Sequence, residues 1–239
     1  MKINDNKIKN VLIVGVSSAI GKSLFEIYID KGFRVYATYN KTKLESSIKN
    51  ACKDSLSIDL SYQYGIEQLL EFAETAKPTN IIYLPGYIDN LDLNNNSLSS
   101  IHKSFNINYF AYLLLISKTY KYMKSIGYGR YLSLSSIGSK YGGASKSINY
   151  TISKRSLEYF PNEYKKLAEF NIFFNNIICG VTNSSILKDK KNIDLNARVS
   201  KIPVKRMARP SEIALNCYRL CSYENTFQTL SNTTIAGGE

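Results

Sequence analysis

The amino-acid sequence predicts a doubly wound α/β domain, a three-layer sandwich in which helices cover both faces of a central parallel sheet of about seven strands. Short apolar runs such as residues 10–15 (NVLIVG) are typical of strands that are buried on both faces of a parallel sheet. These runs alternate with longer segments whose apolar residues recur at helical spacing. A chain of 239 residues with 44% hydrophobic content suits one such domain, so we expect residues 1–239 to form a single unit.

The expected elements follow one another without a linker, a repeat or a low-complexity tract. We expect strands at residues 10–15, 33–39, 55–60, 79–84, 130–136, 171–179 and 229–235. We expect helices at residues 20–31, 41–51, 63–76, 97–126, 147–170 and 210–223. Pro161 should kink or split the helix at 147–170, because proline lacks the amide hydrogen that a helix interior needs.

The net charge of +12 is carried mostly by lysines spread along the chain, without a basic and aromatic nucleic-acid motif. We therefore expect no nucleic-acid partner. One segment, residues 184–209, holds eight Lys or Arg against two Asp, which is half of the net charge. We predict a basic substrate lid here, within the domain, that favours an anionic ligand. The alternative is a solvated loop and helix face.

The sequence favours neither a membrane protein nor a metalloprotein. No apolar run approaches the ~20 residues that span a bilayer, and the first run leads into polar serines without a signal-peptide cleavage pattern. We therefore expect a cytoplasmic location and no membrane partner. The four cysteines are scattered and His102 is the only histidine, so core thiols are favoured over a metal site.

The stretch from Leu132 to Lys154 carries the candidate chemistry. Ser136 lies at a predicted strand end (with Ser135 as the less favoured candidate), and a glycine-rich turn separates it from Tyr150 and Lys154. On a helix this pair shares one face, with Cβ atoms about 5–6 Å apart. An ammonium ~4 Å away could lower the pKa of a tyrosine from ~10 towards neutral pH. The serine hydroxyl could then hold a carbonyl oxygen beside the phenol, which predicts an acid/base site.

A nucleotide site is predicted between the first strand and the first helix, where a parallel sheet presents a helix N-terminus to a pyrophosphate. Gly15 would allow the tight turn, and Gly21 the close approach of helix to strand. Ser17 and Ser18 would add hydroxyl donors, whereas Ala19 places a methyl where glycine would admit a phosphate most closely. The expected cofactor contacts in this turn are Gly15, Ser17, Ser18, Ala19, Ile20 and Gly21.

Together these residues resemble the short-chain dehydrogenase/reductase family, and the resemblance covers almost the whole chain. The chain is similar in size and layout to the 3-oxoacyl-carrier-protein reductases of that family. The resemblance implies a Rossmann-like fold and a catalytic tetrad of Asn108, Ser136, Tyr150 and Lys154. It also implies cofactor contacts at Asp59, Leu60, Gly86, Tyr150, Lys154, Gly180, Thr182 and Ser184. The chain departs from the family pattern at Ala19 and in the segment 83–86 (YLPG), where the family has Asn-Asn-Ala-Gly.

The resemblance implies hydride transfer between a nicotinamide cofactor and a carbonyl or secondary alcohol. Tyr150 would exchange a proton with the carbonyl oxygen, and Ser136 would orient that oxygen. Lys154 would lower the pKa of Tyr150 and bind the nicotinamide ribose, while Asn108 would hold a water behind Lys154. The alternative class is a degenerate member that binds nucleotide as a sensor or scaffold without turnover.

Cofactor choice depends on the end of the second strand, where an acid would bind the 2′-hydroxyl of NAD. Asn40 and Lys41 stand there instead, and a cation suits a 2′-phosphate, so NADP(H) is favoured while NAD(H) stays open. The expected substrate is a small anionic carbonyl compound, either a 3-oxoacyl thioester or an anionic sugar derivative. The family further implies a homodimer or homotetramer through the helices that bear Asn108 and Tyr150.

Overall fold

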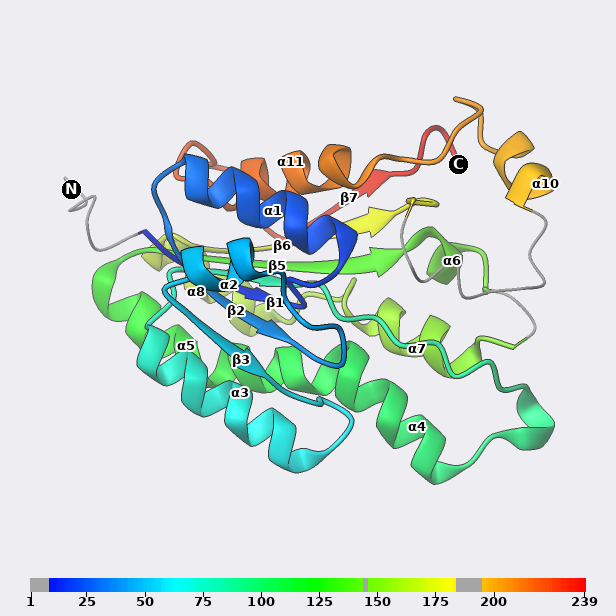
Figure 1. Ribbon diagram of the computed structural model, residues 1–239, viewed down its shortest axis with the longest axis horizontal. Helices are drawn as coiled ribbons and strands as arrows, with labels where there is room; N and C mark the ends of the chain where they lie inside the picture. Colours follow the sequence, from blue (N-terminus) through cyan, green and yellow to red (C-terminus); the bar gives the residue numbers. More distant parts are fainter. Residues whose placement is uncertain (1–8, 144–145, 184–194) are drawn as a thin grey trace.

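The structure, a computed structural model, describes residues 9–143, 146–183 and 195–239. Its central sheet has seven parallel strands in the order β3-β2-β1-β4-β5-β6-β7, with helices on both faces (Figure 1). This doubly wound arrangement confirms the fold class predicted from the sequence. The strands are β1 (Asn10–Val14), β2 (Arg34–Tyr39), β3 (Asp54–Ser57), β4 (Asn80–Tyr83), β5 (Gly129–Ser136), β6 (Ile172–Cys179) and β7 (Ser231–Ile235).

The helices are of three kinds. The α-helices are α1 (Ala19–Asp30), α2 (Ser46–Ala51), α3 (Gln63–Ala76), α4 (Leu98–Phe105), α5 (Ala111–Ile126), α6 (Ile137–Lys140), α7 (Ile148–Ser156), α8 (Asn162–Leu167), α10 (Leu195–Ser200) and α11 (Pro210–Cys221). Two 3₁₀-helices, η2 (Leu93–Asn95) and η4 (Ala168–Phe170), and a π-helix, η3 (Asn106–Phe110), complete the set within the described residues.

Alternate residues of each buried strand enter different cores, as the period of a strand requires. Val11 and Ile13 of β1 pack with α1 and α11 above the sheet in Figure 1. Leu12 and Val14 pack with α3 and α5 below it. Both faces of β1 are therefore covered, and the carboxyl ends of the strands are left as the place where loops and helix N-termini meet.

Most expected elements lie within a few residues of their predicted bounds, and the exceptions have physical causes. β3 ends at Ser57 rather than at residue 60, because its neighbour β2 ends at Tyr39, the register partner of Ser57. The helix expected at 147–170 divides into α7, α8 and η4, with the break just before Pro161. The helix expected at 97–126 is continuous, but η3 inserts a π-helical turn into it.

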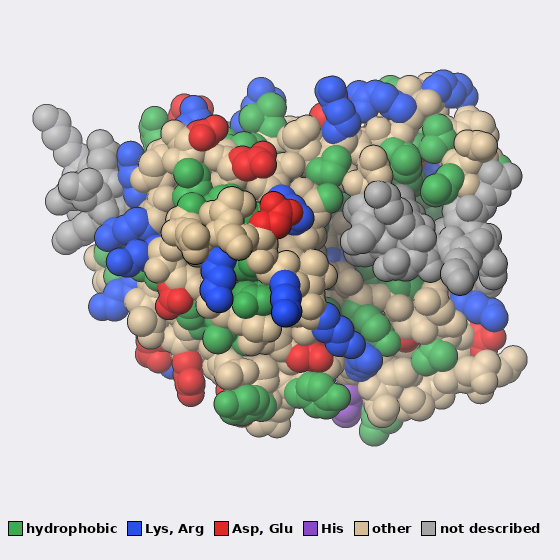
Figure 2. All heavy atoms as spheres, in the orientation of Figure 1, with side chains coloured by type: hydrophobic (Ala, Val, Ile, Leu, Met, Phe, Trp, Pro, Cys, Tyr) green, Lys and Arg blue, Asp and Glu red, His purple; other side chains and the backbone are tan. Residues whose placement is uncertain are grey.

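Within the described part of the chain, no helix combines the length and the apolar character needed to cross a membrane. The same residues hold no group of three or more His, Cys, Asp or Glu that could bind a metal ion. Lys and Arg side chains are spread over the face shown in Figure 2, with Asp and Glu among them. A further group of Lys and Arg lies along the upper right edge, over the segment between α10 and α11.

Candidate active site

Two pockets adjoin at the carboxyl ends of the central strands. One, of about 280 Å³, is lined by residues that follow β4, β5 and β6. The other, of about 290 Å³, is lined by residues that follow β1, β2 and β4. Both are lined by Leu84 and Gly86, so the two pockets form one cleft across the point where the strand order reverses. We call them the catalytic pocket and the nucleotide pocket.

The turn between β1 and α1 shapes one wall of the nucleotide pocket. Gly15 has a φ of +88°, which glycine adopts without steric cost. The amides of Gly15 and Val16 donate hydrogen bonds to the carbonyl oxygen of Thr38 at 3.0 and 2.9 Å. A Cβ on Gly21 would stand 2.6 Å from the carbonyl oxygens of Gly15 and Val16, so only glycine fits this approach of helix to strand.

Ser18 has a different role from the expected one. Its hydroxyl donates to the carbonyl oxygen of Gly15 (2.9 Å) and accepts from the amide of Gly21 (3.0 Å), which makes it the N-cap of α1. The hydroxyl proton predicted for the pyrophosphate is therefore already donated within the turn. Ser17 and Ser18 both line the nucleotide pocket, whereas Ala19 is absent from the lining and Ile20 lines the catalytic pocket.

The far end of the nucleotide pocket is lined by Asn40 and Leu60, as expected for cofactor contacts, but not by Lys41 or Asp59. Asp59 accepts hydrogen bonds from the amide (2.9 Å) and hydroxyl (2.7 Å) of Ser61. Partial burial acts to raise its pKa, but the bonds from Ser61 and the nearby cations Lys41 and Lys103 outweigh burial and lower it. Asp59 is therefore an anion beside the pocket, within the electrostatic reach of Lys41.

Tyr150, Ser136 and Lys154 come together in the catalytic pocket. Burial is the main influence on Tyr150 and raises the pKa of its phenol, while a hydrogen bond with the Ser136 side chain lowers it in part. The pKa is thus raised, contrary to the lowering by Lys154 expected from the spacing. Ser135 is buried and accepts a hydrogen bond from Asn176 at 3.0 Å, so Ser136 is the serine that faces the phenol.

Lys154 is almost fully buried, at 3% exposure. Its ammonium donates to the backbone carbonyls of Pro85 and Leu134, both at 2.7 Å. Burial lowers the pKa of Lys154 to about 8, because the charged form is desolvated. A Cβ on Gly86 would lie 3.6 Å from the Lys154 Nζ and 4.0 Å from a ring carbon of Tyr150, so the segment after β4 lies directly against both side chains.

Asn108 lies behind this pair rather than in the pocket lining. It is fully buried in η3, and its Oδ1 accepts from the Tyr87 amide at 2.7 Å. Its Nδ2 donates to the Tyr87 carbonyl (3.0 Å) and to the Ser153 hydroxyl (2.8 Å). The side chain therefore joins the segment after β4 to α7, and both N–H groups of its amide are bonded to protein partners.

The segment after β6 brings Gly180 and Thr182 into the catalytic pocket. Thr182 pairs with Ala208, and the amide of Ala208 donates to the Val181 carbonyl at 2.9 Å. The predicted contact Ser184 lies outside the described residues, as does the first part of the expected lid, 184–194.

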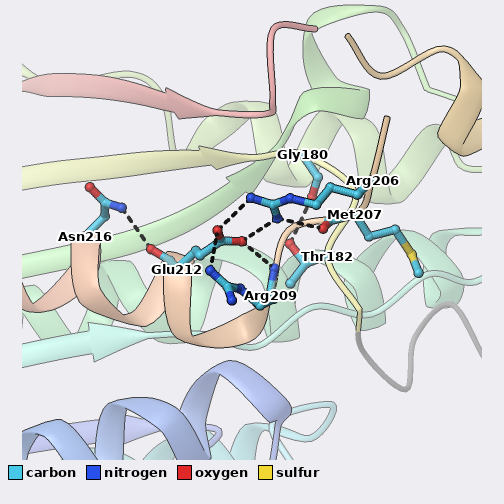
Figure 3. A network of polar contacts seen from close by, with 7 residues as sticks. All are labelled: Gly180, Thr182, Arg206, Met207, Arg209, Glu212 and Asn216. Carbon is cyan, nitrogen blue, oxygen red and sulfur yellow. Dashed lines mark hydrogen bonds and ion pairs between the residues drawn. The ribbon is translucent and has the colours of Figure 1, made fainter. Parts of the chain in front are cut away.

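An ion cluster of Arg206, Arg209 and Glu212 holds the strand-like segment that pairs with Thr182 (Figure 3). Glu212 accepts from both terminal nitrogens of the Arg206 guanidinium at 2.8 Å and from the Arg209 backbone amide at 2.8 Å. The hydrogen bond from Arg206 is the main cause that lowers the pKa of Glu212 to about 2. The motif before the last helix is therefore a structural support for the Thr182 side of the pocket.

Several lining residues escaped sequence reasoning. Cys179, Thr151 and Arg198 line the catalytic pocket, and Tyr87 lines the nucleotide pocket. The burial of Cys179 raises the pKa of its thiol to about 12, so this thiol stays protonated. Arg198 was one of the cations counted in the basic segment. Its position in the pocket depends on how α10 packs, which the sequence pattern does not predict.

Comparisons with known proteins identify the family and the fold of this chain. The family model for short chain dehydrogenases matches residues 9–194. A 3-oxoacyl-[acyl-carrier-protein] reductase FabG of Rickettsia prowazekii is 24% identical over 96% of both chains. An acetoacetyl-CoA reductase of Cupriavidus necator is 30% identical over 117 residues, about half of each chain. The solved 3-oxoacyl (acyl-carrier-protein) reductase of Agrobacterium tumefaciens C58, with NADP bound, has a TM-score of 0.85 at 19% identity, over 100% of this chain and 98% of that one.

The fold, the cleft and the family model place this chain among the oxidoreductases that work with a nicotinamide dinucleotide. It belongs to the short-chain dehydrogenase/reductase family and acts on carbonyl or alcohol groups of small molecules.

Proposed function

We propose that this chain is an NADP(H)-dependent carbonyl reductase that uses Tyr150, Ser136 and Lys154, with Asn108 behind them. The main observation is that Tyr150, Ser136 and the buried Lys154 share a pocket that adjoins a second pocket built on the first βα turn. The relatives named as 3-oxoacyl-carrier-protein reductases support a 3-oxoacyl thioester as substrate. An anionic sugar derivative is the other candidate.

The cleft suits a dinucleotide, because glycines form both the turn at its nucleotide end and the junction between its two pockets. When bound there, NADPH supplies a hydride and is oxidised to NADP⁺. The raised pKa of Tyr150 keeps its phenol protonated at neutral pH, so Tyr150 can donate a proton to the carbonyl oxygen. Ser136 shares a hydrogen bond with that phenol and holds the same oxygen, while Lys154 places a positive charge beside it.

The preference for NADP(H) is supported by the lining of the nucleotide pocket, where none of the described residues is acidic. An acid at this end would bind the 2′-hydroxyl of NAD and repel a 2′-phosphate. Titration of the purified protein with NADPH and NADH, followed by nicotinamide fluorescence, should show tighter binding of NADPH. Lys41→Ala should reduce that preference, whereas Lys43→Ala, which changes another exposed lysine nearby, should not. A wild-type preference for NADH would refute the cofactor assignment.

Tyr150→Phe tests the catalytic assignment. Removing the hydroxyl should lower kcat for reduction of a 3-oxoacyl thioester by about 100-fold or more, because the general acid is lost. NADPH binding should be retained, which shows that the variant is folded. Turnover that survives in Tyr150→Phe would remove Tyr150 from the mechanism. Cofactor binding without turnover in the wild-type protein would instead favour the nucleotide-binding sensor or scaffold.

We further propose a homodimer or homotetramer through the helices that bear Asn108 and Tyr150. Large apolar side chains on these helices are exposed, at 38% for Phe110, 44% for Leu114 and 51% for Ile152. Burying them against a second copy would remove apolar surface from water. Light scattering should therefore give a mass of two or four chains, and Leu114→Asp should lower it. A monomeric mass for the wild-type protein would refute the assembly.

A further inference from the structure

The described lining of the catalytic pocket contains two charged side chains, Lys154 and Arg198, and no acid. Lys154 lies at the floor and donates to two backbone carbonyls. Arg198 comes from α10, which lies at the same end of the sheet as α6 and α7 (Figure 1). The pocket therefore has a second cation that the proposed transfer of hydride and proton does not use.

Arg198 is held by Glu239, which follows β7. Its guanidinium forms an ion pair with the carboxylate Oε1 of Glu239. The Arg198 side chain is 30% exposed, whereas that of Glu239 is 10% exposed. The Oε2 atom of Glu239 is buried and lacks a hydrogen-bond partner among the residues that the structure describes.

The fold fixes Glu239 in this position. Gly237 and Gly238 both have positive φ, and a Cβ on either would stand within 3 Å of the segment that follows α10. On Gly237 it would meet Val204 and Ile202. On Gly238 it would meet Pro203. These contacts hold residues 237 and 238 against the segment that follows α10, which keeps Glu239 close to Arg198.

We propose that Arg198 is the specificity-determining residue that binds a carboxylate or phosphate group of the carbonyl substrate, in competition with Glu239. This inference rests on the proposed reductase function, and it assigns the substrate class to one side chain of the site. A guanidinium binds such anions through two parallel N–H groups, and Glu239 is the one carboxylate that pairs with Arg198 among the residues that the structure describes. The substrate anion and Glu239 would share or exchange the same cation.

Substitutions of Arg198 and Glu239 should change the selectivity for anionic over neutral substrates in opposite directions. Removing the Arg198 guanidinium removes the binding partner of the anion, so selectivity for anionic substrates should fall. Neutralising Glu239 removes the competing negative charge, so that selectivity should rise. A pair that only stabilised the fold would leave this selectivity unchanged in both variants.

The experiment compares each anionic substrate with its neutral analogue under NADPH. The pairs are acetoacetate with ethyl acetoacetate, levulinate with ethyl levulinate, and dihydroxyacetone phosphate with dihydroxyacetone. The readout is the ratio of kcat/KM for the anion to that for the neutral compound, which cancels general effects on catalysis and folding. The first two pairs test a carboxylate at two distances from the carbonyl, and the third tests a phosphate.

The wild-type ratio should exceed one for at least one pair. Arg198→Gln should lower this ratio about tenfold or more. Arg198→Lys keeps the charge without the planar guanidinium, so its ratio should lie between those of the wild-type protein and Arg198→Gln. Glu239→Gln should raise the ratio about threefold or more. Lys201→Gln is the matched control, since Lys201 is an exposed cation just after α10 that does not line the pocket, and it should leave the ratio unchanged.

An unchanged ratio in Arg198→Gln, or a fall in both Arg198→Gln and Glu239→Gln, overturns the inference while the reductase activity still stands. If none of the six compounds is reduced, the reductase proposal fails for these carbonyls. The role of Arg198 is then tested by the binding of an anionic compound to the complex with NADPH. Levulinate must then quench or shift the fluorescence of bound NADPH at lower concentration in the wild-type protein than in Arg198→Gln. Equal binding overturns the role of Arg198.

Discussion

The substitution Gly86→Ala should weaken cofactor binding without destabilising the fold. Gly86 lines both pockets, and its φ is not in the left-handed region, so alanine fits the backbone. The new Cβ would stand 3.5 Å from Cε and 3.6 Å from Nζ of Lys154, which are ordinary contacts. The melting temperature should therefore change by less than about 2 °C.

The same methyl should weaken NADPH binding strongly. It would project into the junction through which a dinucleotide must pass between the two pockets. Inserting a methyl into a close-packed site costs about 1–3 kcal/mol, so the Kd for NADPH should rise by about 10–100-fold. The sequence has no Trp, so nicotinamide fluorescence can be followed without indole background.

Gly127→Ala is the matched control for this prediction. Gly127 has a φ of +67° at the end of α5, and a Cβ there would meet none of the described residues within 4 Å. Alanine should cost about 1 kcal/mol of stability through backbone strain and leave NADPH binding unchanged. If Gly86→Ala binds NADPH as tightly as the wild-type protein, the two pockets are not one cofactor cleft. A large fall in its melting temperature would refute the packing argument.

Three further predictions concern the fold around the cleft. Gly21→Ala should destabilise the protein by about 2–3 kcal/mol and lower its melting temperature by about 5–10 °C, because the Cβ would meet two backbone carbonyls; an unchanged melting curve contradicts this. The pKa of Lys154 is lowered to about 8, so its ammonium is present below that pH and lost above it. The kcat/KM for reduction should therefore fall as the pH rises through about 8. A flat profile to about pH 10 would exclude a role for the Lys154 charge in the reaction. Glu212→Gln should loosen the segment paired with Thr182 and so weaken NADPH binding. The melting temperature should fall only slightly, as is usual when an exposed ion pair is removed. If calorimetry gives the variant the same NADPH affinity as the wild-type protein, Glu212 does not support this side of the pocket.

The sequence was sufficient to predict the elements and the place of the cleft, because both follow from local patterns. Apolar runs mark strands buried on both faces, and parallel strands bring their carboxyl ends together. Tyr150 and Lys154 share a helix, so their spacing alone places them on one face. Ser136 lies close to Tyr150 and Lys154 because it is the last residue of strand β5, against which their helix α7 packs.

Burial and tertiary contacts could not be deduced from those patterns. The pKa of Tyr150 is raised because its phenol is buried, and spacing to a lysine carries no information on burial. Ser18 caps α1, a local contact that competes with the expected one. The partners of Asn108 and the position of Arg198 depend on segments far away in the chain, Tyr87 and Glu239.

The π-helical turn η3 has a consequence for helix phase. Each residue of an α-helix advances the side-chain direction by about 100°, so one extra residue in a turn rotates everything after it relative to what came before. The continuous helix can thereby pack α4 on α7 and α5 on α3, two neighbours in different directions. Deleting one residue between Asn106 and Phe110 would restore the regular phase and rotate one of these interfaces away from its partner. The single long helix thus works as two differently oriented ones, with Asn108 at the change of phase.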